Sequence, residues 1–224
     1  MKVSILMLTH GAKAYVKKSI VTVKKKTNYP AGYELIVVDN DSDRATKKLL
    51  SRLYFKGMVD KLLFAGENLM FAKGNNVAAS LSSKEAEYVL LLNSDIQIND
   101  AQWLEKMVSY MEQHKDSGAI GLRSCSGIPR CDGFALLVKK DLYLKHQLDE
   151  EYEWWWSVTK LQAKIREEGY TVTAVKEYEN LLHHFGGKSP KEAIKTAKGM
   201  SVEMQTVEGW FTCTPETFLE IDSL

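Results

Sequence analysis

The stretch that decides the fold is Tyr88-Val89-Leu90-Leu91-Leu92-Asn93-Ser94-Asp95, an apolar run that ends in an acidic elbow. Short runs of this kind are typical of a strand that is buried on both faces of a parallel sheet. The carboxyl end of such a strand lies at the edge where open α/β sheets bind ligands. An aspartate at that edge either holds a hard cation or caps the next element. The choice between these interpretations decides whether Asp95 belongs to an active site.

The residues around this stretch alternate between two kinds of periodicity. Short apolar runs predict strands, and the segments between them show the spacing of amphipathic helices. We expect strands at Val3–Leu8, Glu34–Val38, Val59–Phe64 and Glu87–Leu92, and helices at Ala12–Lys26, Arg44–Phe55 and Phe71–Leu81. This alternation predicts an α/β fold with a mostly parallel central sheet and helices on both faces.

The second half of the chain continues with a different rhythm and more glycine. It predicts helices at Ala101–His114 and Val158–Glu168, and strands at Phe134–Val138 and Tyr170–Val175. The stretch from His183 to Pro190 is expected to be a loop. No clear periodicity remains from Ser201 onward. We therefore expect one domain over residues 1–200, followed over 201–224 by a tail or the start of a truncated segment.

The composition excludes several classes of protein. The chain has 224 residues, with 30 Lys and Arg against 29 Asp and Glu, so a nucleic-acid-binding protein with a strongly basic domain is not expected. The three cysteines lack paired spacing, which argues against a zinc site or a disulfide scaffold. The apolar amino terminus is too short for a transmembrane segment and lacks a cleavage site. These features favour a cytoplasmic protein without a transmembrane segment.

Polar residues follow each of the first four strands. They are Thr9-His10-Gly11, Asp39-Asn40-Asp41-Ser42-Asp43, Asn68 with the later Lys73-Gly74-Asn75-Asn76, and Asn93-Ser94-Asp95. Parallel strands place all of these groups at one edge of the sheet, so we expect them to share a cleft. Neither a G-x-G-x-x-G nor a P-loop pattern is present, which disfavours a dinucleotide fold and excludes a P-loop enzyme.

Taken in order, these segments resemble glycosyltransferase family 2, the inverting enzymes of the GT-A fold, and especially its rhamnosyltransferase-like branch. The late segment His184-Phe185-Gly186-Gly187-Lys188-Ser189 is similar to a conserved pattern of that branch. The resemblance covers roughly residues 3 to 189. It implies a GT-A domain over residues 1–200, with a nucleotide-sugar half over 1–100 and an acceptor half over 101–200.

The resemblance also implies roles for individual residues. Thr9 and Asp39 would line the nucleoside pocket, with Asp39 bonding the base. The residues expected to bind the donor are Thr9, His10, Asp39, Asn40, Asn68, Lys73, Asn75, Asn76 and Ser94. Asp95 would bind a metal ion as a member of a D-x-D-like motif, and His184 would complete the metal shell.

These roles imply the reactants. The cofactor would be Mn²⁺ or Mg²⁺, because both accept carboxylate ligands and stabilise a leaving diphosphate. The donor would be a UDP- or dTDP-sugar, and the acceptor a hydroxyl of a glycan. Further domains could follow the carboxyl terminus.

The chain departs from the family at the catalytic base. An ungapped comparison places the usual Glu-Asp pair on Ser157-Val158, neither of which can deprotonate a hydroxyl. One explanation is a displaced carboxylate: Glu153, if the helix starts early enough to include it, or Asp149. The others are a domain that binds the donor but transfers it poorly, and a gap in the comparison.

Two other functions remain open. One is a catalytically weak nucleotide-sugar-binding module of a larger protein, suggested by Ser157-Val158. The other is a nucleotidyltransferase, which would share the sheet and a metal-binding carboxylate. A nucleotidyltransferase would normally carry a Gly-rich signature after the first strand, and Thr9-His10-Gly11-Ala12-Lys13 lacks it.

Overall fold

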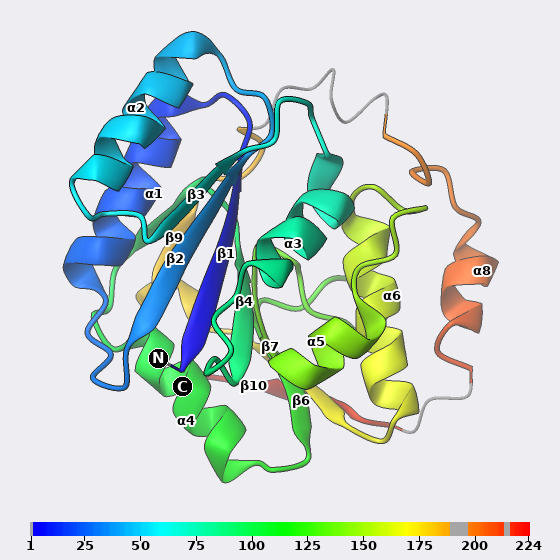
Figure 1. The fold of residues 1–224 in the computed structure, drawn as a ribbon. Helices are drawn as coiled ribbons and strands as arrows, with labels where there is room; N and C mark the ends of the chain where they lie inside the picture. Colours follow the sequence, from blue (N-terminus) through cyan, green and yellow to red (C-terminus); the bar gives the residue numbers. More distant parts are fainter. Residues whose placement is uncertain (1, 189–196, 213–215) are drawn as a thin grey trace.

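The computed structural model describes residues 2–188, 197–212 and 216–224, which form a layered α/β structure (Figure 1). Eight strands make one sheet in the order β10-β8-β6-β7-β4-β1-β2-β3, and β5 pairs with β9 in a second, two-stranded sheet. The strands are β1 (Val3–Thr9), β2 (Tyr33–Asp39), β3 (Lys61–Phe64), β4 (Tyr88–Leu92), β5 (Ile96–Ile98), β6 (Ser117–Leu122), β7 (Ala135–Lys139), β8 (Thr171–Val175), β9 (Leu182–His184) and β10 (Phe218–Ile221).

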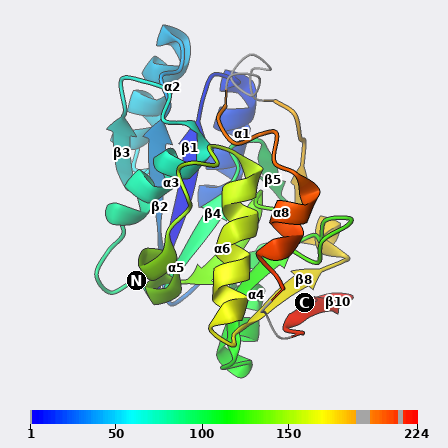
Figure 2. The ribbon, with the colours of Figure 1, turned by 90° about the vertical axis from the view of Figure 1, so that its right-hand side faces the viewer.

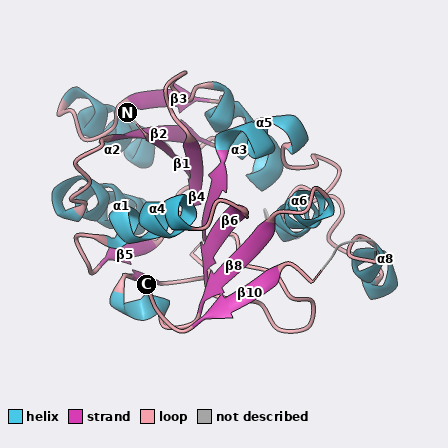
Figure 3. Cartoon of the chain, turned by 90° about the horizontal axis from the view of Figure 1, so that it is seen from below, coloured by secondary structure: helices cyan, strands magenta, loops and turns pink. Residues whose placement is uncertain are grey.

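Helices cover both faces of the large sheet (Figure 3). They are α1 (Lys13–Lys26), α2 (Arg44–Phe55), α3 (Met70–Ser80), α4 (Trp103–Gln113), α5 (Lys140–His146), α6 (Trp155–Glu167) and α8 (Met204–Gly209), with a short 3-10 helix η1 (Tyr178–Asn180). No helix among the described residues is long and apolar enough to cross a membrane.

The sheet is mostly parallel, as the sequence predicts. β1 pairs in parallel with β2 and β4, and β3 extends the row beyond β2. Among the described strands of this sheet, β7 runs antiparallel to both of its neighbours, β4 and β6. The register pairs Thr9 with Asp39, so β1 and β2 end at the same edge.

Two apolar cores separate the sheet from its helical layers. One contains residues of α1, α2 and α4, and the other contains residues of α3, α5 and α6. Along β1, Ile5 and Met7 belong to the first core whereas Leu6 belongs to the second, because successive side chains of a strand point to opposite faces. A strand buried on both faces therefore reads as a continuous apolar run, which is why β1, β2 and β4 are recognisable in the sequence.

Most predicted elements match the structure within a few residues, and α2 matches at both ends. Its amino terminus is fixed by the Asp43 side chain, which accepts hydrogen bonds from the backbone N–H groups of Ala45 (2.8 Å) and Thr46 (3.0 Å). Such a cap satisfies N–H groups that have no partner within the helix.

The sequence did not predict β6, because two glycines interrupt its apolar pattern. Gly118 and Gly121 lie in this strand, and glycine usually weakens a strand interior. Here each glycine is required by packing. A Cβ added at Gly118 would lie 2.5 Å from Cγ2 of Ile165, and one at Gly121 would lie 2.4 Å from Cβ of Cys131.

The sequence shows no clear periodicity after Ser201, but the structure contains a helix and a strand there. Residues 204–209 form α8, which lies alongside α6 in Figure 2. Residues 218–221 form β10, which pairs in parallel with β8 at the edge of the large sheet. The side chains of β10 are half-buried or exposed, so the strand lacks the apolar pattern that marks the inner strands.

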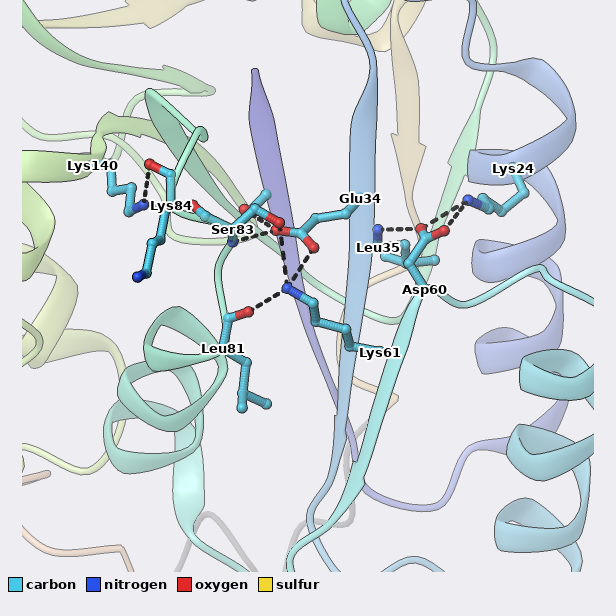
Figure 4. A network of polar contacts seen from close by, with 10 residues as sticks. Lys24, Glu34, Leu35, Asp60, Lys61, Leu81, Ser83, Lys84 and Lys140 are labelled. Atoms are coloured by element: carbon cyan, nitrogen blue, oxygen red, sulfur yellow. Dashed lines mark hydrogen bonds and ion pairs between the residues drawn. The ribbon is translucent and has the colours of Figure 1, made fainter. Parts of the chain in front are cut away.

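A buried carboxylate joins β1, β2 and β3 on the flank of the sheet (Figure 4). Glu34 accepts hydrogen bonds from the Ser4 hydroxyl (2.6 Å) and the Ser83 backbone N–H (2.6 Å), and pairs with the Lys61 ammonium (2.8 Å). Burial alone would raise the pKa of Glu34, but the bonds from Lys61, Ser4 and Ser83 outweigh it and lower the pKa. The ionised form of Glu34 therefore stabilises the fold.

Candidate active site

A cavity of about 330 Å³ opens at the edge of the sheet where β1 and β4 end. It is lined by the ends of these strands, the start of α3, the loop before β7, the start of α6 and the segment after β9. The polar and aromatic residues of the lining are Thr9, His10, Asn40, Asn68, Phe71, Asn75, Asn93, Ser94, Asp95, Asp132, Phe134, Trp154, Trp155, His184 and Lys188. The predicted cleft thus coincides with a cavity.

Backbone hydrogen bonds fix the elbow that carries Asp95. The N–H of Asn93 donates to the carbonyl of Phe134 (2.8 Å), and the N–H of Phe185 donates to the carbonyl of Asp95 (2.9 Å). From the other side, the Ser19 hydroxyl of α1 bonds the carbonyl of Ser94 (2.8 Å). Asp95 is therefore held on a rigid turn, and its side chain reaches the cavity while remaining 13% exposed.

His184 lies directly opposite Asp95, although 89 positions separate them in the sequence. The pairing of β5 with β9 aligns Ile96 with His184, and this brings Nε2 of His184 to 3.2 Å from Oδ1 of Asp95. The same Nε2 lies 3.4 Å from Nδ2 of Asn93. A carboxylate and an imidazole thus face one another at the cavity wall. That the two residues bind one metal ion, as the family resemblance implies, stays a prediction.

Asp39 does not line the cavity, in contrast to its predicted role. It is fully buried, and its carboxylate accepts hydrogen bonds from the Thr9 hydroxyl (2.9 Å) and the Ser42 N–H (3.1 Å). Each carboxylate oxygen of Asp39 therefore already accepts one hydrogen bond. Thr9 does line the cavity, so Asp39 acts on the site by holding Thr9 and the turn at Ser42 in place.

Asn40 lines the cavity next to Asp39 and carries an unpartnered acceptor. Its Nδ2 donates to the carbonyl of Met70 (3.0 Å), and its backbone carbonyl contacts Nδ1 of His10. Its Oδ1 is buried and has no hydrogen-bond partner among the described residues. Because an unsatisfied buried acceptor is costly, this oxygen is a candidate contact for a donor group on a ligand.

The four predicted residues in and before α3 divide into two pairs. Asn68 and Asn75 line the cavity. Asn76 does not line it, because both ends of its amide bind the backbone of Leu148. Its Nδ2 donates to the Leu148 carbonyl (2.8 Å), and its Oδ1 accepts from the Leu148 N–H (3.0 Å). Lys73 does not line it either, and its ammonium lies 3.8 Å from Glu67 on the surface.

The comparison with protein-family models decides the family. Residues 4–130 match the model of glycosyl transferase family 2, which is more than half of the chain. The chain belongs to glycosyl transferase family 2. This match confirms the family predicted from the sequence. The mostly parallel sheet and its helical layers confirm the predicted α/β fold. The family-wide match leaves the rhamnosyltransferase-like branch a prediction.

Solved structures of glycosyltransferases share the fold of this family 2 domain. One is the mannosyltransferase PcManGT from Pyrobaculum calidifontis in complex with GDP-Man and Mn²⁺, with a TM-score of 0.65, 16% identity, and coverage of 76% of this chain and 53% of that one. Another is TarS of S. aureus, with a TM-score of 0.64, 16% identity, and coverage of 79% and 35%. TarS in complex with UDP gives a TM-score of 0.59, 18% identity, and coverage of 73% and 56%.

This chain therefore spans between about a third and a little over half of the length of these structures. A search of curated proteins gave no match.

The two carboxylates that sequence reasoning favoured as the family's catalytic base lie outside the cavity lining. The argument for Glu153 required a helix that includes it, but α6 begins at Trp155. The Glu153 carboxylate instead accepts a hydrogen bond from the Lys198 N–H (2.7 Å). Asp149 is paired with Lys160. Burial acts to raise the pKa of Asp149, but the bonds from Lys160 and the Glu151 N–H outweigh it and lower the pKa.

In the ungapped comparison, the catalytic pair of the family pattern falls on Ser157 and Val158, near the start of α6. Val158, at the position of the usual carboxylate, lines the cavity. Ser157 is fully buried, and its hydroxyl donates to the carbonyl of Trp154 (2.6 Å). The cavity wall at this point is therefore apolar where the family pattern carries an acid.

Asp132 is a cavity residue that the sequence reasoning missed. Apart from Asp95, it is the one carboxylate among the described residues of the lining. Its Oδ1 accepts a hydrogen bond from the Phe134 N–H (3.2 Å), and its Oδ2 pairs with Arg123. The adjacent Gly133 packs on α6, where an added Cβ would lie 3.0 Å from Cγ2 of Val158. An acidic residue immediately before a glycine and a strand was the signal available in the sequence.

Proposed function

We propose that this domain transfers a sugar from a UDP- or dTDP-sugar to a hydroxyl of a glycan acceptor, with inversion at the anomeric carbon and with Mn²⁺ or Mg²⁺ as cofactor. The observation that carries the proposal is the Asp95–His184 pair, 3.2 Å apart at the wall of a cavity on the carboxyl edge of the sheet. Membership in family 2 supports the reaction class. The expected halves of the domain, residues 1–100 for the donor and 101–200 for the acceptor, are part of the proposal.

The nucleoside would bind on the side of Thr9, Asn40 and Asn68. The unpartnered Oδ1 of Asn40 is suited to the N3–H of uracil or thymine, which is a hydrogen-bond donor. Satisfying this buried acceptor would favour these bases over one that presents an unprotonated nitrogen at the same point. UDP in a complex of TarS is consistent with this choice.

The residues at the elbow fit a divalent cation. Asp95 supplies a carboxylate oxygen and His184 an imidazole nitrogen, a mixed set that suits Mn²⁺. The described residues contain no group of three His, Cys, Asp or Glu that would form a closed metal cage. Two protein ligands leave positions for the diphosphate and water, as Mg²⁺ and Mn²⁺ sites at phosphates require. When bound, the ion would offset negative charge on the departing diphosphate.

Asp132 is the proposed base for the acceptor. Its carboxylate would take the proton of the acceptor hydroxyl while that oxygen forms a bond to the anomeric carbon. The bond from this carbon to the diphosphate oxygen breaks, and its electron pair leaves with the nucleoside diphosphate. Arg123 and the Phe134 N–H orient the carboxylate from the side of the loop. The geometry favours Asp132 over Glu153 and Asp149, which do not line the cavity.

The second candidate function is a donor-binding module with weak transfer activity. The apolar Val158 at the usual position of the base favours this function. A site without a base would still bind the donor but would transfer or hydrolyse its sugar only slowly. Release of free sugar without transfer to any glycan, by wild-type protein and the Asp132→Asn variant alike, would favour this alternative.

Calorimetric titration of UDP, dTDP and GDP, with and without Mn²⁺, tests the donor and metal assignments. With CDP added to the series, we expect UDP or dTDP to bind more tightly than CDP, because N3 of cytosine carries no hydrogen for Oδ1 of Asn40. We expect Mn²⁺ to strengthen binding in the wild type but not in Asp95→Asn. Asp132→Asn, which changes the other carboxylate of the lining in the same way, serves as the matched control. Equal Mn²⁺ dependence in Asp95→Asn and the wild type would contradict the metal assignment.

A further inference from the structure

Positive charge is concentrated in two neighbouring helices. α1 and α2 together contain ten of the chain's 30 Lys and Arg residues and none of its 29 Asp and Glu residues. Helices α4 and α6 are mixed, since α4 contains Glu105 and Lys106 and α6 contains Lys164 and Glu167, whereas α3 has one charged residue, Lys73. The nearly neutral chain is therefore strongly polarised.

The two helices lie side by side on one face of the sheet, so their charges form one surface (Figures 1 and 3). We call this surface the basic face. It consists of seven exposed cations, Lys13, Lys17, Lys25, Arg44, Lys48, Arg52 and Lys56. Lys18 and Lys26 of α1 are not members, because their ammonium groups contact the Phe185 ring and the Ile98 carbonyl on the side of β5 and β9. Among the described residues, no ion pair links any of the seven to a carboxylate. The nearby cations that are paired, Lys24 with Asp60 and Lys47 with Asp41, are not members.

The cations of α2 lie along one side of the helix and lead to two exposed aromatic rings. Arg44, Lys48 and Arg52 are spaced by four residues, which places them in one row on the helix surface. Phe55, three residues after Arg52, lies beside this row. It contacts Tyr54 edge to edge with ring centroids 5.8 Å apart, and Phe55 and Tyr54 are 85% and 43% exposed. Phe55 is the most exposed large apolar side chain among the described residues.

We propose that the basic face docks this domain peripherally on a membrane that contains anionic lipid. Lys and Arg near such a surface each contribute to binding, and aromatic side chains insert at the level of the headgroups. A surface for a soluble polyanion would use the cations but would leave Phe55 without a role. The combination of unpaired cations and exposed aromatic rings therefore favours a lipid surface.

This docking would leave the active-site cavity accessible. The basic face is parallel to the large sheet because α1 and α2 cover one face of it. The cavity instead opens at the edge of the sheet where β1 and β4 end. A domain lying on its basic face would therefore open its cavity sideways along the membrane.

Co-flotation of the full chain with vesicles tests the proposal. The vesicles are made of phosphatidylcholine alone or of phosphatidylcholine mixed with phosphatidylglycerol, at low and high salt. We expect binding only to the mixed vesicles, weakened by salt because exposed charges are screened. The triple variant Lys48→Glu/Arg52→Glu/Lys56→Glu should bind at least ~10-fold more weakly, and Tyr54→Ser/Phe55→Ser should also bind more weakly at unchanged net charge.

Matched controls separate docking at this face from a general charge effect. Lys84→Glu/Lys115→Glu/Lys176→Glu changes the net charge equally at exposed lysines elsewhere, and Leu144→Ser removes an exposed apolar side chain of another helix. Both controls should bind like the wild type, with unchanged melting temperatures in all variants. Equal losses in the two triple variants would overturn the proposal. So would binding of heparin with no binding to mixed vesicles, which would assign the face to a soluble polyanion.

Discussion

His184 stacks face to face on Phe134, with ring centroids 4.3 Å apart and ring planes 5° apart. Phe134 follows Asp132 by two residues, and its carbonyl also receives the N–H of Asn93. A single aromatic residue thus connects the loop of the proposed base, the acidic elbow and the proposed metal ligand. The guanidinium carbon of Arg123 lies 4.9 Å from the centroid of the same ring.

Replacing Phe134 by leucine should weaken metal binding without removing a ligand. The stacked pair fixes the plane of the His184 ring, and such pairs contribute about 0.5–1.5 kcal/mol. We expect Mn²⁺ affinity, measured by calorimetry in the presence of UDP, to fall about 3- to 10-fold. Phe71→Leu, which changes another aromatic residue of the lining, is the control. An unchanged affinity in Phe134→Leu would show that the strand pairing alone orients His184.

Replacing Asp132 by asparagine should remove the base but leave the shape of the site. We expect kcat for transfer to fall by about 10²–10⁴-fold, the usual contribution of general base catalysis, while UDP affinity stays within about twofold. Glu153→Gln and Asp149→Asn should retain kcat. If Glu153→Gln lost most of its kcat while Asp132→Asn stayed active, the base would be Glu153, as the sequence favoured.

Removing one hydrogen on the base of the nucleotide should mimic a mutation of Asn40. A UDP analogue methylated at N3 lacks the donor for Oδ1 of Asn40, so we expect it to bind the wild type about 10-fold more weakly than UDP. In Asn40→Ala the two nucleotides should bind equally. If the analogue loses as much affinity in Asn40→Ala as in the wild type, Oδ1 does not contact N3–H.

The sequence predicts the inner strands and the elbow because burial on both faces leaves a continuous apolar run. Asp95 and His184 were foreseen through the family resemblance, and the structure brings them together. It does not bring Asp39, Lys73 or Asn76 to the cavity. The sequence does not tell whether an asparagine such as Asn76 faces the ligand or fixes a neighbouring loop. The structure decides this, because the Asn76 amide forms hydrogen bonds with the backbone of Leu148.

Acid should destabilise the protein through Glu34. Its pKa is lowered in the folded state, so its contribution to the free energy of unfolding is present above the pKa of an unfolded glutamate and is lost as the pH falls through the lowered folded value. We expect Glu34→Gln to be less stable by about 1–3 kcal/mol at pH 7. Its stability should also vary less with pH in urea titrations in the acid range. Parallel pH profiles for the variant and the wild type would contradict this assignment.

Glycine 121 should be intolerant of even one added carbon. A Cβ there would lie 2.4 Å from Cβ of Cys131, inside the packed interface between β6 and the loop before β7. We expect Gly121→Ala to lower the free energy of unfolding by about 1–3 kcal/mol. Gly209→Ala in α8 is the control, since nothing lies within 4 Å of its added Cβ and its stability should not fall. Equal stability of both variants would show that β6 can shift.

The reversed direction of β7 has a consequence for how specificity can change in this domain. The parallel strands β1 and β4 supply the cavity with residues that follow them, whereas β7 supplies Asp132, Gly133 and Phe134, which precede it. The connection between β6 and β7 therefore enters the cavity from the opposite direction, and only its end at Phe134 contacts the elbow and His184. The part before Asp132 can vary in length and composition while Phe134 keeps these contacts, so selection for a new acceptor could act on one loop while the donor site stays intact.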